Sequence, residues 1–312
     1  PDVSVTHKAS QCNCTLTSLS GILIFTFEVS PMIQALIGKW FSKRRKIPHY
    51  LYVQDLWPEN LQVVGGIHNK VILNHYQKMS DKIYESCSNI FATSPSFVRN
   101  IQERVNDKEK VLYWPQYAEE FYKPVAKKII NEIPNDNRFK IIFTGNIGEA
   151  QGLDILPKAA RLLDDSICFL LVGNGRYRDE LISEVQDVKE RFVFIDRQPA
   201  ERIPELLAAC DVAFLSFMDS PLFAKTIPAK LQTYMACGMP ILAAASGETK
   251  RIVEEAQCGI CCELGNAEEL AKAIKKMSSI AKKEFGINAV NYCNVHFNRE
   301  FLMNEITSIF GE

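Results

Sequence analysis

Six short apolar runs, each four to six residues long, alternate with helix-forming segments through the second half of the 312-residue chain. Runs of this length and composition are typical of strands that are covered on both faces, as in a parallel sheet. Regular alternation of strand and helix favours an α/β domain wound around such a sheet. The predicted strands are residues 139–144, 167–172, 191–195, 211–216, 239–244 and 259–262.

The first half of the chain contains about four such runs, so a smaller sheet is expected there. A helix is predicted from Ser30 to about Lys46, with Ser30 as N-cap and Pro31 in the first turn, where no backbone N–H is needed. Residues 1–20 lack clear periodicity and follow a first residue that is not Met, which indicates a fragment or an altered start. The predicted strands are residues 21–27, 48–53, 89–93 and 110–113.

The composition excludes several classes of protein. Apolar residues make up 47% and charged residues 23% of the chain, as in globular domains. The formal net charge of −1 gives no basis for binding nucleic acid, and no apolar run is long enough for a membrane span.

Cys168, Cys210 and Cys237 lie in apolar segments. The CxxC spacing from Cys258 has no matching second pair, so reduced cysteines in a cytosolic protein are expected rather than a zinc or redox site.

The segment from Thr226 to Ala245 carries the clearest functional pattern, reading as loop, helix, tight turn and buried strand. Pro228 suits the first helical turn, and Gly238 suits the left-handed residue that ends a helix. Thr226 and Lys230 lie at the helix N-terminus, where free N–H groups, the helix dipole and a positive charge favour an anion. An ordinary strand–helix unit with a surface lysine explains these residues equally well.

This segment resembles the donor-binding segment of family 4 glycosyltransferases. The pattern Pro-x-Lys-Leu-x-x-Tyr-Met-Ala-x-Gly-x-Pro-Ile starts at Pro228, and the resemblance covers most of residues 48–275. It is strongest to the branch that builds bacterial surface polysaccharides. The resemblance implies two Rossmann-like α/β domains facing across a cleft, the GT-B arrangement, with an incomplete N-terminal domain. The implied domains are an acceptor-side domain with linker at 1–137, a donor-binding domain at 138–290, and a terminal helix at 291–312 packing back on the first domain.

The resemblance also implies where a nucleotide sugar binds. Two glycine-bearing loops follow the first two strands of the second domain, and glycine lets the backbone approach a ligand closely. Many relatives place Arg and Lys where this chain has Asn146 and Gln151, and glutamates where it has Lys225 and Thr233. Charge neutralisation is therefore expected from lysines and helix N-termini, with no metal ion or other cofactor. The implied donor-binding residues are Gly145, Asn146, Gly148, Gln151, Gly173, Asn174, Gly175, Arg176, Arg197, Lys225, Thr226, Lys230 and Glu248.

On the acceptor side, residues 54–59 resemble the family's Asp-Leu-Trp-Pro loop. Asp55 and Glu59 are candidate catalytic residues that orient an acceptor hydroxyl or accept its proton. A cap on the following turn is a strong alternative for Asp55. Gln54 stands where many relatives have histidine, so no histidine base is expected at that position.

The predicted helix at 30–46 carries an apolar stripe of Ile33, Leu36, Ile37, Trp40 and Phe41, followed by four basic residues, 43–46. Such a helix fits an anionic membrane surface. We favour a crossover helix whose stripe packs on the sheet. Weak peripheral attraction of the basic run to the inner face of the cell membrane is left open.

Three functional hypotheses follow. The first is a retaining glycosyltransferase that moves a sugar from a nucleotide diphosphate sugar, expected to be UDP-linked, to a glycan or lipid-linked acceptor in cell-envelope synthesis. The second is a truncated nucleotide-sugar binding module or subunit without turnover. The third, a GT-B epimerase, is disfavoured because the matching segments are those of transferases.

Overall fold

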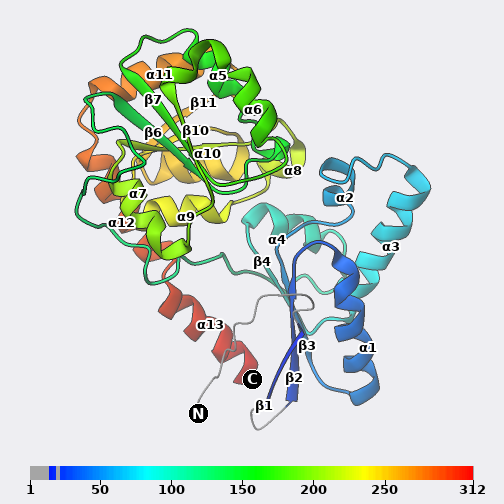
Figure 1. The fold of residues 1–312 in the computed structure, drawn as a ribbon. Helices are drawn as coiled ribbons and strands as arrows, with labels where there is room; N and C mark the ends of the chain where they lie inside the picture. Colours follow the sequence, from blue (N-terminus) through cyan, green and yellow to red (C-terminus); the bar gives the residue numbers. More distant parts are fainter. Residues whose placement is uncertain (1–13, 19–21, 312) are drawn as a thin grey trace. The chain divides into compact units, whose positions relative to one another are not determined.

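The computed structural model describes residues 14–18 and 22–311, which form two compact units divided between Pro115 and Gln116. Each unit contains one sheet with helices packed against it (Figure 1). The prediction of an α/β chain with two Rossmann-like sheets is confirmed. The division lies ahead of the predicted linker, and the domain limits at residues 137 and 290 stay predictions.

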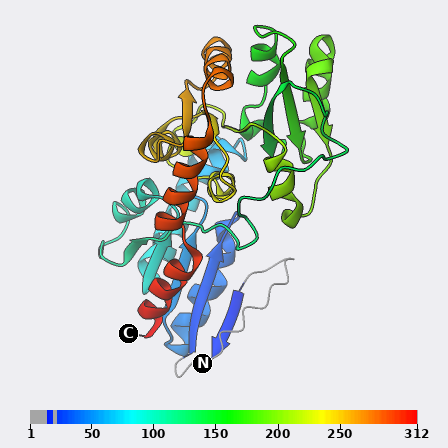
Figure 2. The same cartoon turned by 90° about the vertical axis from the view of Figure 1, so that its left-hand side faces the viewer.

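Unit 1 is built on a five-stranded sheet in the order β1-β2-β3-β4-β5. The four predicted strands are present and pair in parallel, whereas β1 pairs antiparallel with β2 at the sheet edge (Figure 2). β1 lies within residues 1–20, where the sequence shows no clear periodicity and no strand was predicted. The strands are β1 (Cys14–Ser18), β2 (Ile22–Glu28), β3 (His49–Val53), β4 (Asn89–Ala92) and β5 (Val111–Tyr113).

Side-chain caps are present at the start of α3 and α4 but not of η1, α1 or α2. Ser94 caps α4, since its Oγ accepts from the backbone N–H of Phe97 at 3.0 Å. The predicted cap at Ser30 is wrong, because Pro31 is the N-cap of a 3-10 turn and the Ser30 hydroxyl donates to Asp55 instead. The helices are η1 (Met32–Gln34), α1 (Ala35–Arg45), α2 (Glu59–Val63), α3 (Lys70–Ser86) and α4 (Pro95–Gln102).

Three of the five residues in the predicted apolar stripe are exposed and do not pack on the sheet. Ile33, Ile37 and Trp40 are 49%, 52% and 60% exposed. α1 meets the sheet through small residues, and a Cβ added at Gly38 would lie 2.6 Å from Thr26 Oγ1. This close approach leaves no room for large side chains at the contact, so they point outward.

Unit 2 is built on a six-stranded parallel sheet in the order β11-β10-β9-β6-β7-β8, and all six predicted runs are strands. From β6 the chain adds β7 and β8 on one side, and it then adds β9, β10 and β11 on the other side. The order of strand addition therefore reverses between β6 and β9. In open α/β sheets, ligands bind outside the carboxyl ends of the strands at such a switch point. The strands are β6 (Phe139–Thr144), β7 (Ile167–Val172), β8 (Phe192–Ile195), β9 (Val212–Ser216), β10 (Ile241–Ala244) and β11 (Gly259–Cys262).

Helices cover both faces of this sheet (Figure 1). One hydrophobic core includes residues of α7, α9, α10 and α12, and the other includes residues of α5, α6 and α11. The α-helices are α5 (Ile155–Ala160), α6 (Arg178–Glu184), α7 (Ile203–Ala208), α8 (Pro221–Ala224), α9 (Ala229–Ala236), α10 (Gly247–Glu255), α11 (Ala267–Ser279), α12 (Lys283–His296) and α13 (Arg299–Gly311), and the 3-10 helices are η2 (Glu149–Gln151), η3 (Gln186–Arg191) and η4 (Ala200–Arg202).

The prediction that Gly238 ends a helix in a left-handed conformation is confirmed. Gly238, after α9, has a φ of 69° in the left-handed region. Asn266 caps α11, since its side chain accepts from the backbone N–H of Glu269 at 3.0 Å. Ser246 occupies the N-cap of α10 but makes no side-chain capping bond.

The cysteines of unit 2 behave as small apolar residues. Cys168, Cys210 and Cys237 are buried free thiols, as predicted. The CxxC segment forms β11, and burial raises the pKa of Cys258 and Cys261 to about 12. Among the described residues there is no cluster of three or more potential metal ligands, and no helix is long and apolar enough to cross a membrane.

Candidate active site

Two glycine loops meet at the carboxyl ends of β6 and β7. Gly145 and Gly173 have φ angles of 133° and 141°, which favour glycine. A Cβ added at Gly173 would lie 1.9 Å from the carbonyl oxygen of Gly145, so a side chain there would force the loops apart. The Ile147 N–H donates to the Asn174 carbonyl at 2.8 Å and joins the loops. Gly175 is equally enclosed, with an added Cβ 2.2 Å from the Ile147 carbonyl.

Lys230, in the first turn of α9, lies against the first of these loops. Its Nζ donates to Gln151 Oε1 and lies 4.1 Å from the centre of the Phe143 ring. A Cβ added at Gly145 would lie 3.7 Å from the same Nζ. Burial lowers the pKa of Lys230 to about 7, and no carboxylate among the described residues pairs with it. A desolvated cation without a carboxylate partner is suited to binding an anion.

Tyr234 fixes α9 against the end of β6, a role that sequence reasoning missed. Its hydroxyl accepts from the Thr144 backbone N–H at 2.8 Å and lies 3.3 Å from the Thr144 carbonyl as a donor. The side chain is fully buried, and burial raises its pKa to about 12. Tyr234 is the tyrosine of the pattern that starts at Pro228. The presence of tyrosine rather than phenylalanine at this position could have indicated such a hydrogen bond, because a buried hydroxyl needs a partner.

Thr226 and Lys225 lie just ahead of α9, in the loop that follows α8. The Thr226 hydroxyl donates to the Leu222 carbonyl at 3.0 Å, and its own carbonyl accepts from Thr249 Oγ1 at 3.2 Å. Lys225 is the C-cap of α8 and is partly exposed. These bonds anchor the segment that leads into the N-terminus of α9.

Glu248 lies in the first turn of α10, next to the same segment. Its side chain is buried and accepts from Arg251 at 3.0 Å. Gly247 has a φ of 59°, and an added Cβ there would lie 1.8 Å from the Ala224 carbonyl. The start of α10 therefore lies directly against the end of α8.

The two candidate arginines are placed differently. Arg176 and Arg197 are exposed, and neither side chain has a hydrogen-bond or ion-pair partner in the part of the chain that the structure describes. Arg178, by contrast, pairs with Asp196 at 3.0 Å. The structure therefore brings together residues of both glycine loops with Gln151 and Lys230, while no described contact joins Arg176 or Arg197 to them. Asn146 and Asn174 are also exposed, and Gly148 is partly exposed.

On the candidate acceptor side, Asp55 is anchored to the loop that follows β2. Its Oδ2 accepts from the Ser30 backbone N–H at 3.0 Å and from Ser30 Oγ at 2.8 Å. Ser30 Oγ in turn accepts from Asn60 at 2.7 Å and from the Trp57 indole at 3.2 Å. The Asp55 carboxylate is therefore held by Ser30, which Trp57 and Asn60 hold in turn.

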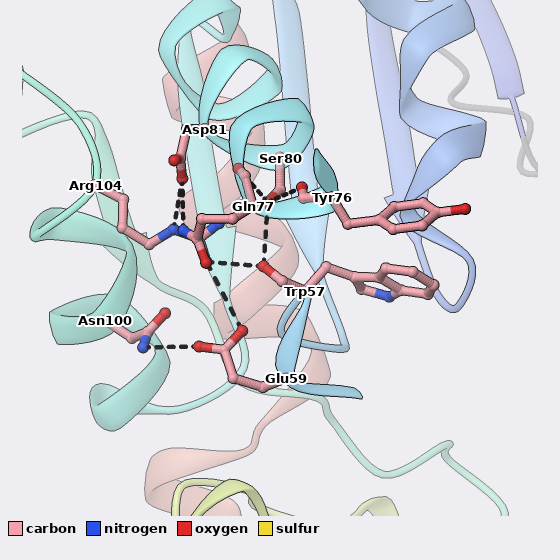
Figure 3. A network of polar contacts seen from close by, with 8 residues as sticks. All are labelled: Trp57, Glu59, Tyr76, Gln77, Ser80, Asp81, Asn100 and Arg104. Atoms are coloured by element: carbon pink, nitrogen blue, oxygen red, sulfur yellow. Dashed lines mark hydrogen bonds and ion pairs between the residues drawn. The ribbon is translucent and has the colours of Figure 1, made fainter. Parts of the chain in front are cut away.

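Glu59 is the first residue of α2 and belongs to a second network, centred on Arg104 (Figure 3). Its Oε1 accepts from Asn100 at 3.2 Å, and its Oε2 lies 4.0 Å from Arg104. The Arg104 guanidinium lies 4.8 Å from the centre of the Tyr84 ring. Arg104 also donates hydrogen bonds to the Trp57 carbonyl at 2.9 Å, to Ser80 Oγ at 2.6 Å and to Asp81 at 2.8 Å.

Glu28, the last residue of β2, is a buried carboxyl that sequence reasoning overlooked. It is 0% exposed, and neither carboxyl oxygen has a hydrogen-bond partner of normal geometry among the described residues. Burial and then the charge of Asp55 raise its pKa well above the usual value, and the nearby backbone N–H groups of Asp55 and Gln54 offset only part of this. The sequence predicted that this strand ends at Phe27, so Glu28 was placed outside the strand and was not considered.

Comparison with known proteins gives a match to one family model. Residues 126–289 match the family model of "Glycosyl transferases group 1". The chain is 27% identical over 205 residues to the putative colanic acid biosynthesis glycosyl transferase WcaI of Escherichia coli, covering 62% of this chain and 50% of WcaI. It is 26% identical over 150 residues to 2-deoxystreptamine glucosyltransferase of Streptomyces kanamyceticus, covering 46% of this chain and 38% of that protein. The chain thus matches half or less of the length of these relatives.

Solved structures share the fold at low sequence identity. HepE of Anabaena, solved in complex with UDP, has a TM-score of 0.75 and 18% identity, covering 93% of this chain and 78% of HepE. Sucrose-phosphate synthase of Thermosynechococcus elongatus has a TM-score of 0.76 and 17% identity, covering 92% of this chain and 72% of that one. Since the family model spans more than half of the chain, the protein belongs to the group 1 glycosyl transferases, the family 4 enzymes of GT-B fold.

Proposed function

We propose that this chain acts as a retaining glycosyltransferase that transfers a hexosyl or N-acetylhexosaminyl group from a UDP-sugar to a hydroxyl acceptor. The acceptor is a glycan or a lipid-linked glycan of the cell envelope, and the protein works in the cytoplasm with peripheral contact at the inner membrane face. The observation that carries the proposal is the meeting of two glycine loops and Lys230 at the switch point of the sheet in unit 2.

In this proposal, unit 2 binds the donor. The diphosphate lies against Gly145 and Gly173, where the backbone is open to close approach, and next to the Lys230 ammonium. As the bond to the sugar breaks, negative charge develops on the leaving diphosphate, and preorganised donors stabilise that charge most effectively. The proposal needs no metal ion or other cofactor, because a lysine and a helix N-terminus supply the positive charge.

Unit 1 supplies the acceptor side of the proposal. Asp55, just after β3, and Glu59, at the start of α2, each accept hydrogen bonds that keep both carboxylates in fixed positions. A fixed carboxylate can accept a hydrogen bond from an acceptor hydroxyl and orient it for attack. Retention by front-face attack requires no protein nucleophile, so we assign orientation rather than covalent chemistry to these residues.

A binding module without turnover is the second candidate. It is favoured by the neutral residues Asn146 and Gln151 in the first glycine loop and by Thr233 in α9. In that case unit 2 would still hold a nucleotide diphosphate, but sugar transfer would be absent.

Calorimetric titration with UDP, in the absence of divalent metal, tests the donor assignment. Saturable binding of UDP by the folded chain is expected, with weaker binding of other nucleoside diphosphates. No binding would overturn both candidates, since each requires a nucleotide site. Release of UDP from a UDP-sugar in the presence of a hydroxyl acceptor then separates the transferase from the binding module.

Replacing Lys230 with Ala is expected to weaken UDP binding by about 1–3 kcal/mol, the range for a hydrogen bond to a charged group. The affinity of the unmodified chain should also fall as pH rises above 7, because Lys230, with a pKa of about 7, must take up a proton to bind the anion. Calorimetry at pH 7 and pH 9 measures both effects.

The matched control for this prediction is Lys158→Ala, which removes an exposed lysine paired with Asp154 on α5. It should bind UDP as the unmodified chain does and keep the pH dependence. A folded Lys230→Ala variant with unchanged affinity and the same pH dependence would remove Lys230 from the site.

A further inference from the structure

The outward face of α1 combines exposed apolar side chains with a run of positive charge. Ile33, Ile37 and Trp40 recur at intervals of four and three residues, which places them on one side of a helix. Residues 43–46 continue from them as Lys-Arg-Arg-Lys, and all four are exposed. We call Ile33, Ile37, Trp40 and residues 43–46 together the α1 surface.

The charge on this surface is not neutralised by its neighbours in sequence. Between Glu28 and Asp55 the chain has five basic residues and no acidic residue, although its overall net charge is −1. The guanidinium groups of Arg44 and Arg45 lie 5.7 Å from the centres of the Trp40 and Phe41 rings. Pairing with aromatic rings leaves these arginines fully charged.

The position of α1 in unit 1 explains why this face is open. Gly38 brings the helix tightly onto β2 and β3, so the opposite face carries the large side chains. α1 lies beside α3, and Lys39 Nζ donates to the Lys82 carbonyl at the end of α3 at 2.7 Å (Figure 1). Lys82 is itself exposed, and Val71 on the same helix is 78% exposed. Contact with α3 thus leaves Ile33, Ile37, Trp40 and residues 43–46 exposed.

We propose that the α1 surface docks on an anionic lipid bilayer, with Trp40 and the two isoleucines entering the headgroup region and residues 43–46 contacting lipid phosphates. Amphipathic segments that combine tryptophan, aliphatic residues and clustered Lys and Arg bind bilayers in this way. The proposal rests on the membrane contact in the proposed function and gives it a location.

Charge complementarity favours lipid over a second copy of the chain. In a twofold dimer the same patch meets itself, so the basic run of one copy would oppose the basic run of the other. Like charges brought together repel each other, whereas an anionic leaflet attracts each of them.

Trp40 makes the docking directly measurable in the full chain. It is 60% exposed, whereas Trp57 and Trp114 are 5% and 6% exposed, and the chain has three tryptophans. The chain is mixed with vesicles of equal parts phosphatidylcholine and phosphatidylglycerol, with pure phosphatidylcholine as the comparison. We expect co-sedimentation with the anionic vesicles, weakened by salt, a blue shift of tryptophan emission, and quenching by lipids brominated in the acyl chains.

Two variants test the two components of the surface. Replacing both Ile33 and Ile37 with Ser, which keeps Trp40 as the reporter, should reduce the blue shift and the quenching, and replacing residues 43–46 with Glu should weaken binding roughly tenfold or more. The charge control replaces Lys272, Lys275 and Lys276, exposed on α11, with Glu. The apolar control is Val295→Ser on α12, where the side chain is 68% exposed. Both controls should bind as the unmodified chain does.

Three results would overturn the proposal. They are no binding to anionic vesicles, binding that the α1 variants leave unchanged, and self-association through this face in place of lipid binding. Vesicle binding is measured without nucleotide and UDP binding without vesicles. A chain that binds UDP but not vesicles therefore refutes only the docking surface, and the reverse result refutes only the donor site.

Discussion

Replacing Arg104 with Met is expected to lower the free energy of unfolding of unit 1 by about 2–4 kcal/mol. The Arg104 side chain is only 10% exposed, and its guanidinium contacts Asp81, Ser80 and the Trp57 carbonyl. Methionine keeps the aliphatic part of the side chain beside Tyr84 but leaves these partners without their hydrogen bonds to Arg104. The loss should remain below that of a fully buried ion pair, because the Asp81 and Glu59 side chains are 36% and 30% exposed.

Tryptophan fluorescence during urea unfolding measures this effect in unit 1 alone, because Trp40, Trp57 and Trp114 all lie before residue 116. Arg99→Met is the matched control, since Arg99 is an exposed arginine on α4 and its loss should change stability by less than about 0.5 kcal/mol. Equal unfolding free energies for the two variants would show that the Arg104 network contributes nothing beyond a surface arginine.

The same network bears on function through the Trp57–Glu59 loop. Arg104 and Ser80 both donate to the Trp57 carbonyl, two residues ahead of Glu59 (Figure 3). If Glu59 orients the acceptor, a folded Arg104→Met chain should lose transferase rate while UDP affinity stays unchanged. A double-mutant cycle of Arg104→Met with Asp81→Asn would separate the ion pair from the contact with the loop.

Much of the fold could be predicted because it depends on local patterns. The six buried strands of unit 2 are short apolar runs, and their side chains specify burial without reference to distant residues. Gly145 and Gly173 were also recognisable, because glycine after a strand in an α/β unit is tied to a backbone conformation that other residues rarely adopt. The Ser94 cap followed from the same kind of local chemistry.

The expectations that proved wrong depended on tertiary contacts. A hydroxyl such as Ser30 can cap a helix or bond a distant group, and its actual partner, Asp55, lies 25 residues further along the chain. The face of α1 that packs on the sheet is determined by the close fit of Gly38 to Thr26 and His49. Helical periodicity in the sequence gives no information about this fit. β1 is specified by backbone pairing with β2 rather than by its own pattern.

The candidate site was predictable in its parts but not in its supporting contacts. The residues of both glycine loops and Lys230 could be named from the segment they occupy. Tyr234 and Arg104 could not, because their partners lie 90 and 23 to 47 residues away. Long-range hydrogen bonds of this kind fix where the candidate residues lie, and sequence spacing gives no measure of them.

Glu28→Gln is expected to make the chain progressively more stable than the unmodified protein as pH rises from 5 to 8. The pKa of Glu28 is raised in the folded state, by burial and then by the charge of Asp55. The folded state therefore binds a proton that the unfolded state releases above its ordinary pKa of about 4.3. The stabilising contribution is complete below that value and is lost with rising pH, by up to about 1.4 kcal/mol for each pH unit.

Glutamine has no proton to release, so this pH dependence should be absent from the variant when urea unfolding is followed by tryptophan fluorescence. Glu85→Gln is the matched control in the same unit, because hydrogen bonds from Asn106 lower the pKa of Glu85 and keep it ionised throughout this range. It should leave the pH dependence unchanged. Parallel pH curves for Glu28→Gln and the unmodified chain would mean that Glu28 is ionised in the folded state. A charge buried beside Asp55 would then need a cation or donor that the described contacts do not contain.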